Sequence, residues 1–213
     1  MKKLLIPILF FFFFGILSAQ ESVEKQLEVI TNEEEATSYL ENDKTVKGEI
    51  QVFNEMKHKT PLAEDLLKKG KGGTKTIDRG FETVRYKVLD VYFETHYRAA
   101  IIMFDSSQSS LDKINSTRAF ILKKFKEGYP YDLLAKQYSM DTSTANRGGD
   151  LGWFTPGTYI EDLEHKIISR EFALDDIFLV DIPDENKYYV VLKTHEPMEV
   201  KEAKVLKIIE SVR

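Results

Sequence analysis

The chain has 213 residues, with 30 basic and 35 acidic side chains, four histidines and no cysteine. This length suffices for one compact unit, or two small ones, with a substantial core. The lack of cysteine excludes disulfides, thiolate metal sites and a cysteine nucleophile. The net charge of −5 argues against a nucleic-acid-binding surface, because phosphate binding needs a basic field. Charged residues at 31% beside hydrophobic residues at 42% are typical of a soluble globular protein.

Residues 1–19 are predicted to form a secretory signal peptide. A basic start at Lys2 and Lys3 precedes an apolar run over residues 4–17, and Ala19 offers a small residue at the cut. The alternative is an uncleaved membrane anchor, but the run is shorter than the roughly 20 residues that a span needs. We therefore expect cleavage after Ala19, a periplasmic or secreted protein, and no stable membrane span after cleavage. The mature chain would carry 28 basic and 35 acidic residues, a net charge of −7.

The first half of the mature chain is predicted to contain two helices and two strands. Thr31-Asn32-Glu33-Glu34 forms a capping-box pattern before a short helix. Residues 47–54 and 83–95 are rich in Val, Ile, Phe and Tyr, which favours strands. A short helix is predicted over residues 61–69 and ends at Gly70. The glycine-rich segment 70–76 lacks the spacing of a phosphate-binding loop, so we predict a plain turn.

The second half has the clearer pattern. Residues 97–104 form a nearly continuous apolar run, as expected for a strand buried on both faces. Apolar residues at helical spacing, together with Gly128 and Pro156-Gly157, predict three helices. A last buried strand follows. These four elements are a helix ending at Gly128, helices over 131–139 and 159–167, and a strand over 187–194. The order indicates an α+β domain of roughly 100 residues.

An internal repeat is predicted from segments that match at an offset of 101 to 103 residues. The matching pairs are GEIQVF at 48–53 with GDLGWF at 149–154, Leu62 with Leu163, and YKVL at 86–89 with YVVL at 189–192. The first copy is shorter, with one helix before its glycine segment where the second has two. We interpret the chain as a reduced module followed by a full one. If so, the two modules should share their strand order.

Residues 97–194 resemble the parvulin family of peptidyl-prolyl cis-trans isomerases. The resemblance rests on LAKQYSMD at 134–141, RGGDLGWF at 147–154 and Pro156-Gly157. It implies an α+β fold with a parvulin-like four-stranded antiparallel sheet wrapped by helices, preceded here by a reduced parvulin-like repeat. The implied organisation is a signal peptide over 1–19, a reduced module over 20–95, a parvulin-like domain over 96–196 and a C-terminal tail over 197–213.

The resemblance also implies a set of site residues. Asp141 stands at the family's Cys/Asp position, and Leu151 keeps the leucine of the proline pocket. Tyr159 and Leu163 stand where the pocket methionine and phenylalanine are expected. Ile101, or Ala100 if the register slips by one, stands where the first family histidine is expected, and Tyr189 stands where the second is expected. Asp141 and Tyr189 are therefore the candidate catalytic residues, and Ile101, Leu151, Tyr159 and Leu163 the candidate substrate-binding residues.

Simpler interpretations compete with these roles. Asp141 is as well placed to cap the turn after Ser139, and Trp153 and Phe154 are more typical of core residues. No metal site or other cofactor is predicted, because the four histidines are scattered and no calcium-loop pattern occurs. Asn115-Ser116-Thr117 is a formal glycosylation sequon, but it fits the start of a helix.

The resemblance implies an exported folding factor that binds proline-containing segments of unfolded or extended polypeptides. Isomerisation needs no nucleophile, because only the barrier to rotation of the amide must fall. With both histidines replaced, we expect isomerase activity that is weakened or lost. The alternatives are a catalytically silent peptide-binding chaperone and an envelope interaction module on the same fold.

The tail allows two interpretations. Residues 200–209 can form an amphipathic helix, or a strand that returns to the first module beside residues 84–91. The first module has only the short segment 27–30 as a candidate opening strand of its own. We therefore hypothesise that the tail adds a strand there.

Overall fold

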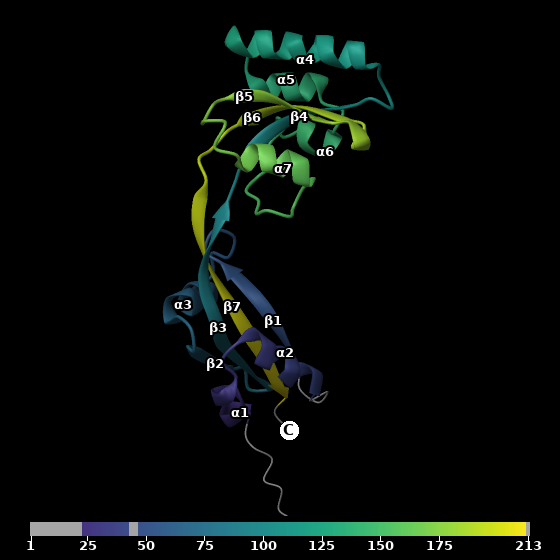
Figure 1. Cartoon of the computed structure of the whole chain (residues 1–213). Coiled ribbons are helices and arrows are strands. Elements are labelled where there is room, and N and C mark those ends of the chain that lie inside the picture. Colours follow the sequence, from purple (N-terminus) through teal and green to yellow (C-terminus); the bar gives the residue numbers. More distant parts are fainter. Residues whose placement is uncertain (1–22, 43–46, 212–213) are drawn as a thin grey trace, which may run out of the picture.

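The computed structural model describes residues 23–42 and 47–211, which form two lobes joined by long strands (Figure 1). The predicted signal peptide and its cleavage site at Ala19 lie outside the described residues. None of the helices within the described ranges is both long and apolar enough to cross a membrane.

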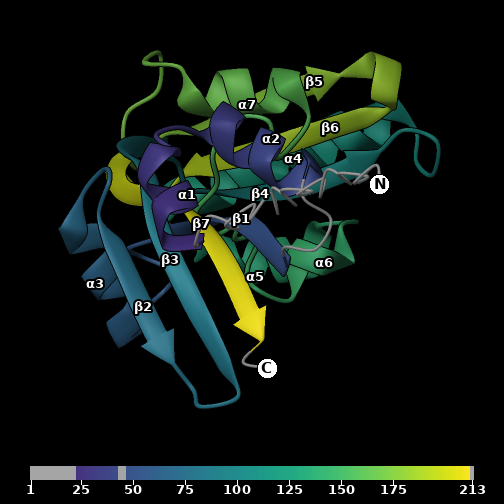
Figure 2. The same ribbon diagram turned by 90° about the horizontal axis from the view of Figure 1, so that it is seen from below.

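The first lobe is a four-stranded antiparallel sheet with helices on both faces. Its strands are β1 (Lys47–Asn54), β2 (Thr74–Asp78), β3 (Glu82–His96) and β7 (Met198–Ser211), in the order β1-β7-β3-β2. Helix α3 (Pro61–Lys69) covers one face, and helices α1 (Val23–Val29) and α2 (Glu33–Asn42) cover the other. Figure 2 shows this sheet from below, with α1 and α2 on the side opposite α3.

The second lobe is built on a three-stranded antiparallel sheet. Its strands are β4 (Ala99–Asp105), β5 (Ile177–Ile182) and β6 (Lys187–Lys193), in the order β4-β6-β5. Helices α4 (Leu111–Lys126) and α5 (Tyr131–Tyr138) pack on one face, and α7 (Glu161–Ile168) packs on the other. Two short elements complete the lobe: the one-turn helix α6 (Thr142–Ala145) and the 3₁₀ turn Pro183–Glu185.

The predicted fourth strand of this lobe is replaced by two isolated bridges. Within the described residues, segment 149–154 forms two isolated backbone bridges, Ala100–Asp150 in β4 and Tyr97–Phe154 just before it. Gly149 and Gly152 have φ angles of 83° and 72°, which no regular strand contains. The glycines therefore interrupt the ladder, and the sheet has three strands rather than the four that the family resemblance implies.

Strand β7 confirms the expectation that the tail returns to the first lobe. It pairs with β3 from Glu82–Ser211 to His96–Met198, a range that includes residues 84–91, and lies between β3 and β1. The helical alternative for the tail is therefore wrong. Because β3 leads into β4 and β6 leads into β7, the second lobe is inserted between two neighbouring strands of the first, and the tail at 197–213 contributes a central strand of the first sheet.

The two sheets have corresponding strand orders. The first reads β1-β7-β3-β2, and the second reads segment 149–154, β4, β6, β5. Since segment 48–53 lies in β1, the elements that match in sequence occupy matching places. This correspondence supports our proposal of an internal repeat. The expected superposition of Phe53 on Phe154, Leu62 on Leu163 and Tyr86 on Tyr189 stays a prediction.

Several local predictions are confirmed or corrected. Helix α3 has the predicted bounds, because Thr60 accepts a hydrogen bond from the Ala63 amide (3.2 Å) and Gly70 ends it with a φ of 74°. The turn after Gly70 is shorter than predicted, since β2 begins at Thr74. Strand β5 was not predicted, although Phe178, Val180 and Ile182 alternate with exposed residues as in a half-buried strand.

The N-terminal segment departs further from what the sequence predicts. Residues 27–30, expected as a strand, lie largely in helix α1, whose Leu27 is buried against the sheet. The Lys87 ammonium donates to the Leu27 and Glu28 carbonyls at the end of this helix, which stabilises a helix terminus there. The cap of α2 lies one residue later than predicted: Asn32 Oδ1 accepts from the Glu35 amide (2.9 Å).

Candidate functional site

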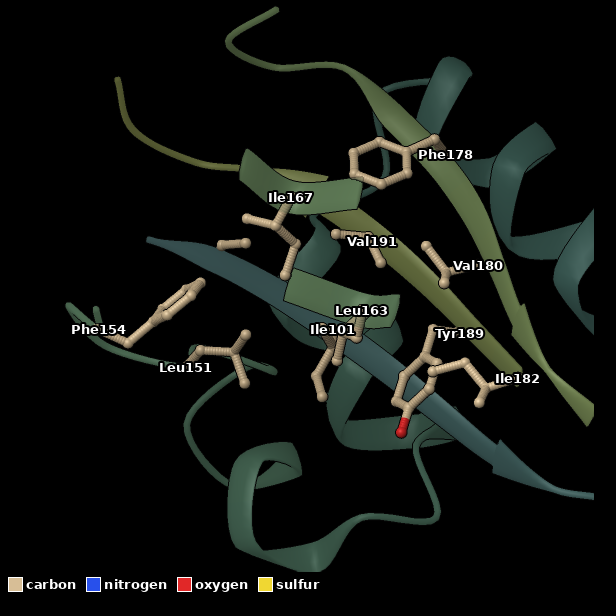
Figure 3. Packing of buried hydrophobic residues seen from close by; sticks show 11 residues of the cluster. Ile101, Leu151, Phe154, Leu163, Ile167, Phe178, Val180, Ile182, Tyr189 and Val191 are labelled. Carbon is tan, nitrogen blue, oxygen red and sulfur yellow. The ribbon is translucent and has the colours of Figure 1, made fainter. Parts of the chain in front are cut away.

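Four of the six candidate site residues lie in one buried cluster on the α7 face of the second sheet. Ile101, Leu151, Leu163 and Tyr189 are 4%, 6%, 2% and 5% exposed and belong to the same group of packed side chains. Figure 3 shows them between the strands and α7, with Phe154 and Ile167 at one end and Ile182 at the other. Tyr159 is half-buried and packs against this cluster.

The strand register explains why these residues meet. Ile101 pairs with Val191, and Met103 pairs with Tyr189, in the β4–β6 ladder. Because side chains two residues apart share a face of a sheet, all four face α7. Helix α7 supplies Leu163 and Ile167, four residues apart on one side of the helix.

Leu151 is placed by a glycine that no other residue can replace. The Leu151 amide donates to the Ala99 carbonyl (3.0 Å), and the Ile101 amide donates to the Gly149 carbonyl (2.9 Å). A Cβ on Gly149 would lie 2.3 Å from the Ile101 carbonyl oxygen, at a φ of +83°. Only glycine fits this close approach of the two chains, so the glycine segment fixes Leu151 against β4.

Tyr159 is held by its hydroxyl, its ring and its backbone. Its hydroxyl donates to the Leu151 carbonyl (2.9 Å), and its ring meets Phe154 edge-on at 5.1 Å. The Glu164 carboxylate, which is 4% exposed, accepts from the amides of Gly157, Thr158 and Tyr159 at 2.7 to 2.8 Å. Burial raises the pKa of Tyr159, so the hydroxyl stays a donor. Glu164 was not predicted from the sequence, although a carboxylate in the first turn of a helix was a signal for it.

Asp141 is the N-cap of helix α6. Its Oδ1 accepts from the Ser143 amide (3.0 Å) and hydroxyl (2.6 Å), and its Oδ2 accepts from the Thr144 hydroxyl (2.7 Å). Burial acts to raise its pKa, but these hydrogen bonds outweigh burial and leave the pKa below its ordinary value. The capping interpretation is thus confirmed, and the carboxylate is ionised at neutral pH.

The Tyr189 hydroxyl has no hydrogen-bond partner among the described residues, and its oxygen reaches the surface although most of the side chain is buried. In Figure 3 the oxygen points away from Phe178 and Val191. Burial raises the pKa of Tyr189, and the negative charges of Asp141 and Glu185 raise it further. The Tyr189 hydroxyl is therefore a donor without an internal partner, close enough to Asp141 for the charge of that carboxylate to act on it.

Two methionines complete this region and were not predicted from the sequence. Met103 lies opposite Tyr189 in the ladder, is half-buried and packs against the cluster. Met140, which precedes Asp141, is 38% exposed, and its amide donates to the Met103 carbonyl (2.8 Å). For Met103 the available signal was the continuous apolar run of residues 97–104, and Met140 had no signal of its own. Flexible thioethers suit contacts with varied apolar partners.

The arrangement offers an apolar wall with polar groups at its edge. The wall is Leu151, Leu163 and Met103, and the polar groups are the Tyr189 hydroxyl and the ionised Asp141. Within the described residues, no group of three or more His, Asp or Glu side chains could hold a metal ion. The region is suited to apolar binding and hydrogen bonding rather than to covalent chemistry.

Comparisons with known proteins find similarity over part of the chain. Residues 84–182 match the family model described as the PPIC-type PPIase domain, so Tyr189 lies beyond the matched range. A 74-residue stretch is 35% identical to the chaperone SurA of Legionella pneumophila strain Lens, covering 35% of this chain and 17% of that protein. A 106-residue stretch is 33% identical to the foldase PrsA of Geobacillus sp. strain WCH70, covering 45% of this chain and 38% of that protein.

Among solved structures, PrsA from Bacillus subtilis is 29% identical, with a TM-score of 0.38, and the match covers 47% of this chain and 35% of that chain. The chain spans less than two fifths of the length of each of these three relatives.

Proposed function

We propose that the protein is an exported folding factor, because residues 84–182 match the PPIC-type PPIase domain and parts of the chain are similar to the chaperone SurA and the foldase PrsA. It binds proline-containing segments of extended polypeptides at the face formed by Asp141, Leu151, Tyr159 and Tyr189, and it isomerises Xaa–Pro bonds slowly. The observation that carries this proposal is the unpartnered Tyr189 hydroxyl beside an apolar wall and an ionised carboxylate.

The reaction makes modest chemical demands. Rotation about an amide crosses a barrier of roughly 18–20 kcal/mol, and no bond is formed or broken. A catalyst need only bind the twisted amide better than either planar form. The apolar side chains hold the proline ring, so the rotating amide lies at the polar edge of the cluster.

Each polar group has a separate part in this scheme. The Tyr189 hydroxyl donates to the proline nitrogen, because loss of conjugation returns the lone pair to that nitrogen and makes it an acceptor only in the twisted amide. Burial raises the pKa of Tyr189, and the negative charge of Asp141 raises it further, so the hydroxyl stays a donor. The ionised Asp141 acts on the rotating amide through its charge. Ile101, where the family has a histidine, contributes only apolar surface, which supports slow turnover.

A second function from a different class is favoured by the burial of the cluster. Ile101, Leu163 and Tyr189 are each 5% exposed or less, so a proline ring enters only if side chains move. A silent peptide-binding module would use the exposed edge at Met140 and Tyr159 without admitting the ring. The isomerase and the silent module would both bind Xaa-Pro peptides, but only the isomerase would turn them over.

The deciding experiment is a protease-free isomerisation assay on an Xaa-Pro tetrapeptide, with binding of the same peptide measured separately. We expect wild-type turnover above the uncatalysed rate of about 0.01–0.1 s⁻¹. Asp141→Asn keeps the cap of α6, because Asn caps helices as well as Asp does. It should reduce turnover and lower the thermal midpoint less than Asp141→Ala does.

Asp141→Ala is the matched variant. It removes both the charge and the cap, at a cost of about 1 kcal/mol. Turnover that equals the uncatalysed rate in all three proteins, with binding retained, would establish the silent module instead.

Export is the part of the proposal that rests on residues 1–19. The N-terminal sequence of the protein recovered from the periplasm or medium should begin at Gln20. Recovery of a cell-bound protein that still begins at Met1 would contradict cleavage.

A further inference from the structure

A cavity of about 470 Å³ lies where the two lobes meet. This volume is within the roughly 300–1,000 Å³ typical of ligand sites. It forms because the two-stranded ribbon opens at this point: the β3–β7 pairing ends at His96–Met198, and the β4–β6 pairing begins at Ala99–Lys193. The loop between α7 and β5 overhangs the opening and forms one wall.

This wall is held in place without any ligand. Lys193, at the end of β6, exchanges backbone hydrogen bonds with the loop: its amide donates to Asp176 (3.0 Å), and its carbonyl accepts from Asp175 (2.9 Å). Its buried ammonium donates to the Phe172 carbonyl (2.7 Å). The Phe172 ring stacks on Phe178 at 3.7 Å. A preformed wall loses little entropy when it binds a partner.

The cavity places opposite charges on opposite sides. Arg170 lines the loop wall, and Glu196 and Glu199 line the side formed by the start of β7. Within the described residues, neither Arg170 nor Glu196 forms an ion pair, and no carboxylate lies within 4.0 Å of the Lys193 ammonium. Glu199 accepts from the Thr95 hydroxyl (2.5 Å). Donors on one wall and acceptors on the other complement a peptide backbone, which carries both.

A chain of aromatic rings connects this cavity to the proposed proline site. Tyr97 lines the cavity, and its ring lies 6.2 Å from Phe154, which lies 5.1 Å from Tyr159. The Tyr97 and Tyr159 ring centroids are therefore at most about 11 Å apart. An extended chain advances about 3.3–3.6 Å per residue. Three or four residues of one client would bridge the two places.

We infer that the cavity at the lobe junction, lined by Tyr97, Arg170, Phe172, Lys193 and Glu196, binds an extended polypeptide segment through its backbone and without need of proline. This inference rests on the proposed function, which supplies a polypeptide as the substrate. Binding at the junction would keep a client close to the proline site and raise its effective concentration there.

The test is peptide binding to the full chain, followed by fluorescence anisotropy. The probe is a fluorescein-labelled, proline-free 14-residue peptide of Gly, Ser, Tyr, Lys and Glu. Ala173→Trp fills the cavity, because Ala173 lines it. Leu174→Trp is the matched control, since Leu174 is 41% exposed and does not line the cavity. We expect Ala173→Trp to weaken binding at least tenfold and Leu174→Trp to change it less than twofold.

Arg170→Ala is a second variant that removes an exposed side chain and so leaves the fold intact. It should weaken binding about threefold, and more at low ionic strength than at high. Turnover of an Xaa-Pro tetrapeptide, too short to reach the junction, should be the same in Leu174→Trp and wild type.

The outcomes separate this inference from the proposed function. A folded Ala173→Trp protein with wild-type affinity, or a wild-type protein that does not bind the proline-free peptide, would overturn the inference. If Ala173→Trp misfolds, unchanged affinity in Arg170→Ala overturns it equally. If Ala173→Trp and Arg170→Ala both weaken peptide binding while the wild-type protein shows no isomerase turnover, the junction site is upheld and the isomerase function is rejected.

Discussion

At the scale of single residues, Tyr159 and Tyr189 differ in what their hydroxyl groups contact. Tyr159 donates to the Leu151 carbonyl, whereas Tyr189 has no internal partner among the described residues. Both side chains pack against the same apolar cluster. A hydroxyl that contributes nothing to the fold is free for a ligand, whereas one that fixes a loop is structural.

These two tyrosines provide the first prediction. Tyr159→Phe should lower the free energy of unfolding by about 1 kcal/mol, because it leaves the Leu151 carbonyl without its donor. Tyr189→Phe should leave stability unchanged within about 0.5 kcal/mol, since no internal hydrogen bond is lost, and should reduce isomerase turnover. Urea denaturation and the tetrapeptide assay measure the two effects.

The roles would be reversed if Tyr189→Phe destabilised the protein and left turnover intact. That result would place a hydrogen-bond partner, rather than a substrate, at the Tyr189 hydroxyl.

At the scale of elements, β7 joins the parts of the first lobe. It lies between β1 and β3 and contributes to the cores on both faces of the sheet. Leu206 and Ile208 face α1 and α2, and Ala203 and Val205 face α3. The last strand in the sequence is therefore a central one in the structure, and the first lobe cannot complete its sheet until the second has been synthesised.

A second prediction tests this position. Leu206 is fully buried, so Leu206→Ala should cost about 2–5 kcal/mol through lost contacts and a cavity. Leu179→Ala, on the edge strand β5 where the leucine is 43% exposed, is the matched control and should cost less than about 1 kcal/mol. Urea-induced unfolding followed by circular dichroism measures both. Equal costs would mean that β7 is not held in the sheet as described.

At the scale of the whole molecule, several carboxylates determine how stability depends on pH. Asp105 accepts from the Lys187 ammonium (2.6 Å) and the Ser107 amide (2.8 Å), which fastens the end of β4 to the start of β6. The Lys187 hydrogen bond, with those from Ser107, holds the pKa of Asp105 well below 3.8. The pKa of Asp150 is lowered by its paired Arg98, and that of Asp141 also lies below its ordinary value.

The third prediction follows from these directions. An aspartate with a depressed pKa binds its proton more readily in the unfolded chain, so its stabilisation is present above about pH 4 and is lost as pH falls further. The free energy of unfolding should therefore decline from about pH 5 to pH 2. Asp105→Asn should be less stable than wild type at pH 7, with a shallower decline. Parallel curves for the two proteins would show that Asp105 is not coupled to folding.

The sequence by itself predicted the elements that local physics controls. Thr60 caps the start of helix α3, and Gly70 ends it. Both effects are local, so they do not depend on what the helix packs against. Strands β1, β3 and β6 were visible because runs of β-branched and aromatic residues favour extended chain. The candidate residues Ile101, Leu151, Leu163 and Tyr189 came from motif positions, and the structure brings them together.

Tertiary structure decided what depends on distant partners. The tail was ambiguous between helix and strand until pairing with β1 and β3 selected the strand, because a sheet with an open centre leaves backbone groups unsatisfied. Residues 27–29 lie in helix α1, where the Lys87 ammonium from a distant strand donates to the Leu27 and Glu28 carbonyls. The unpartnered Tyr189 hydroxyl and the junction cavity likewise depend on which groups surround them, and local sequence does not encode that.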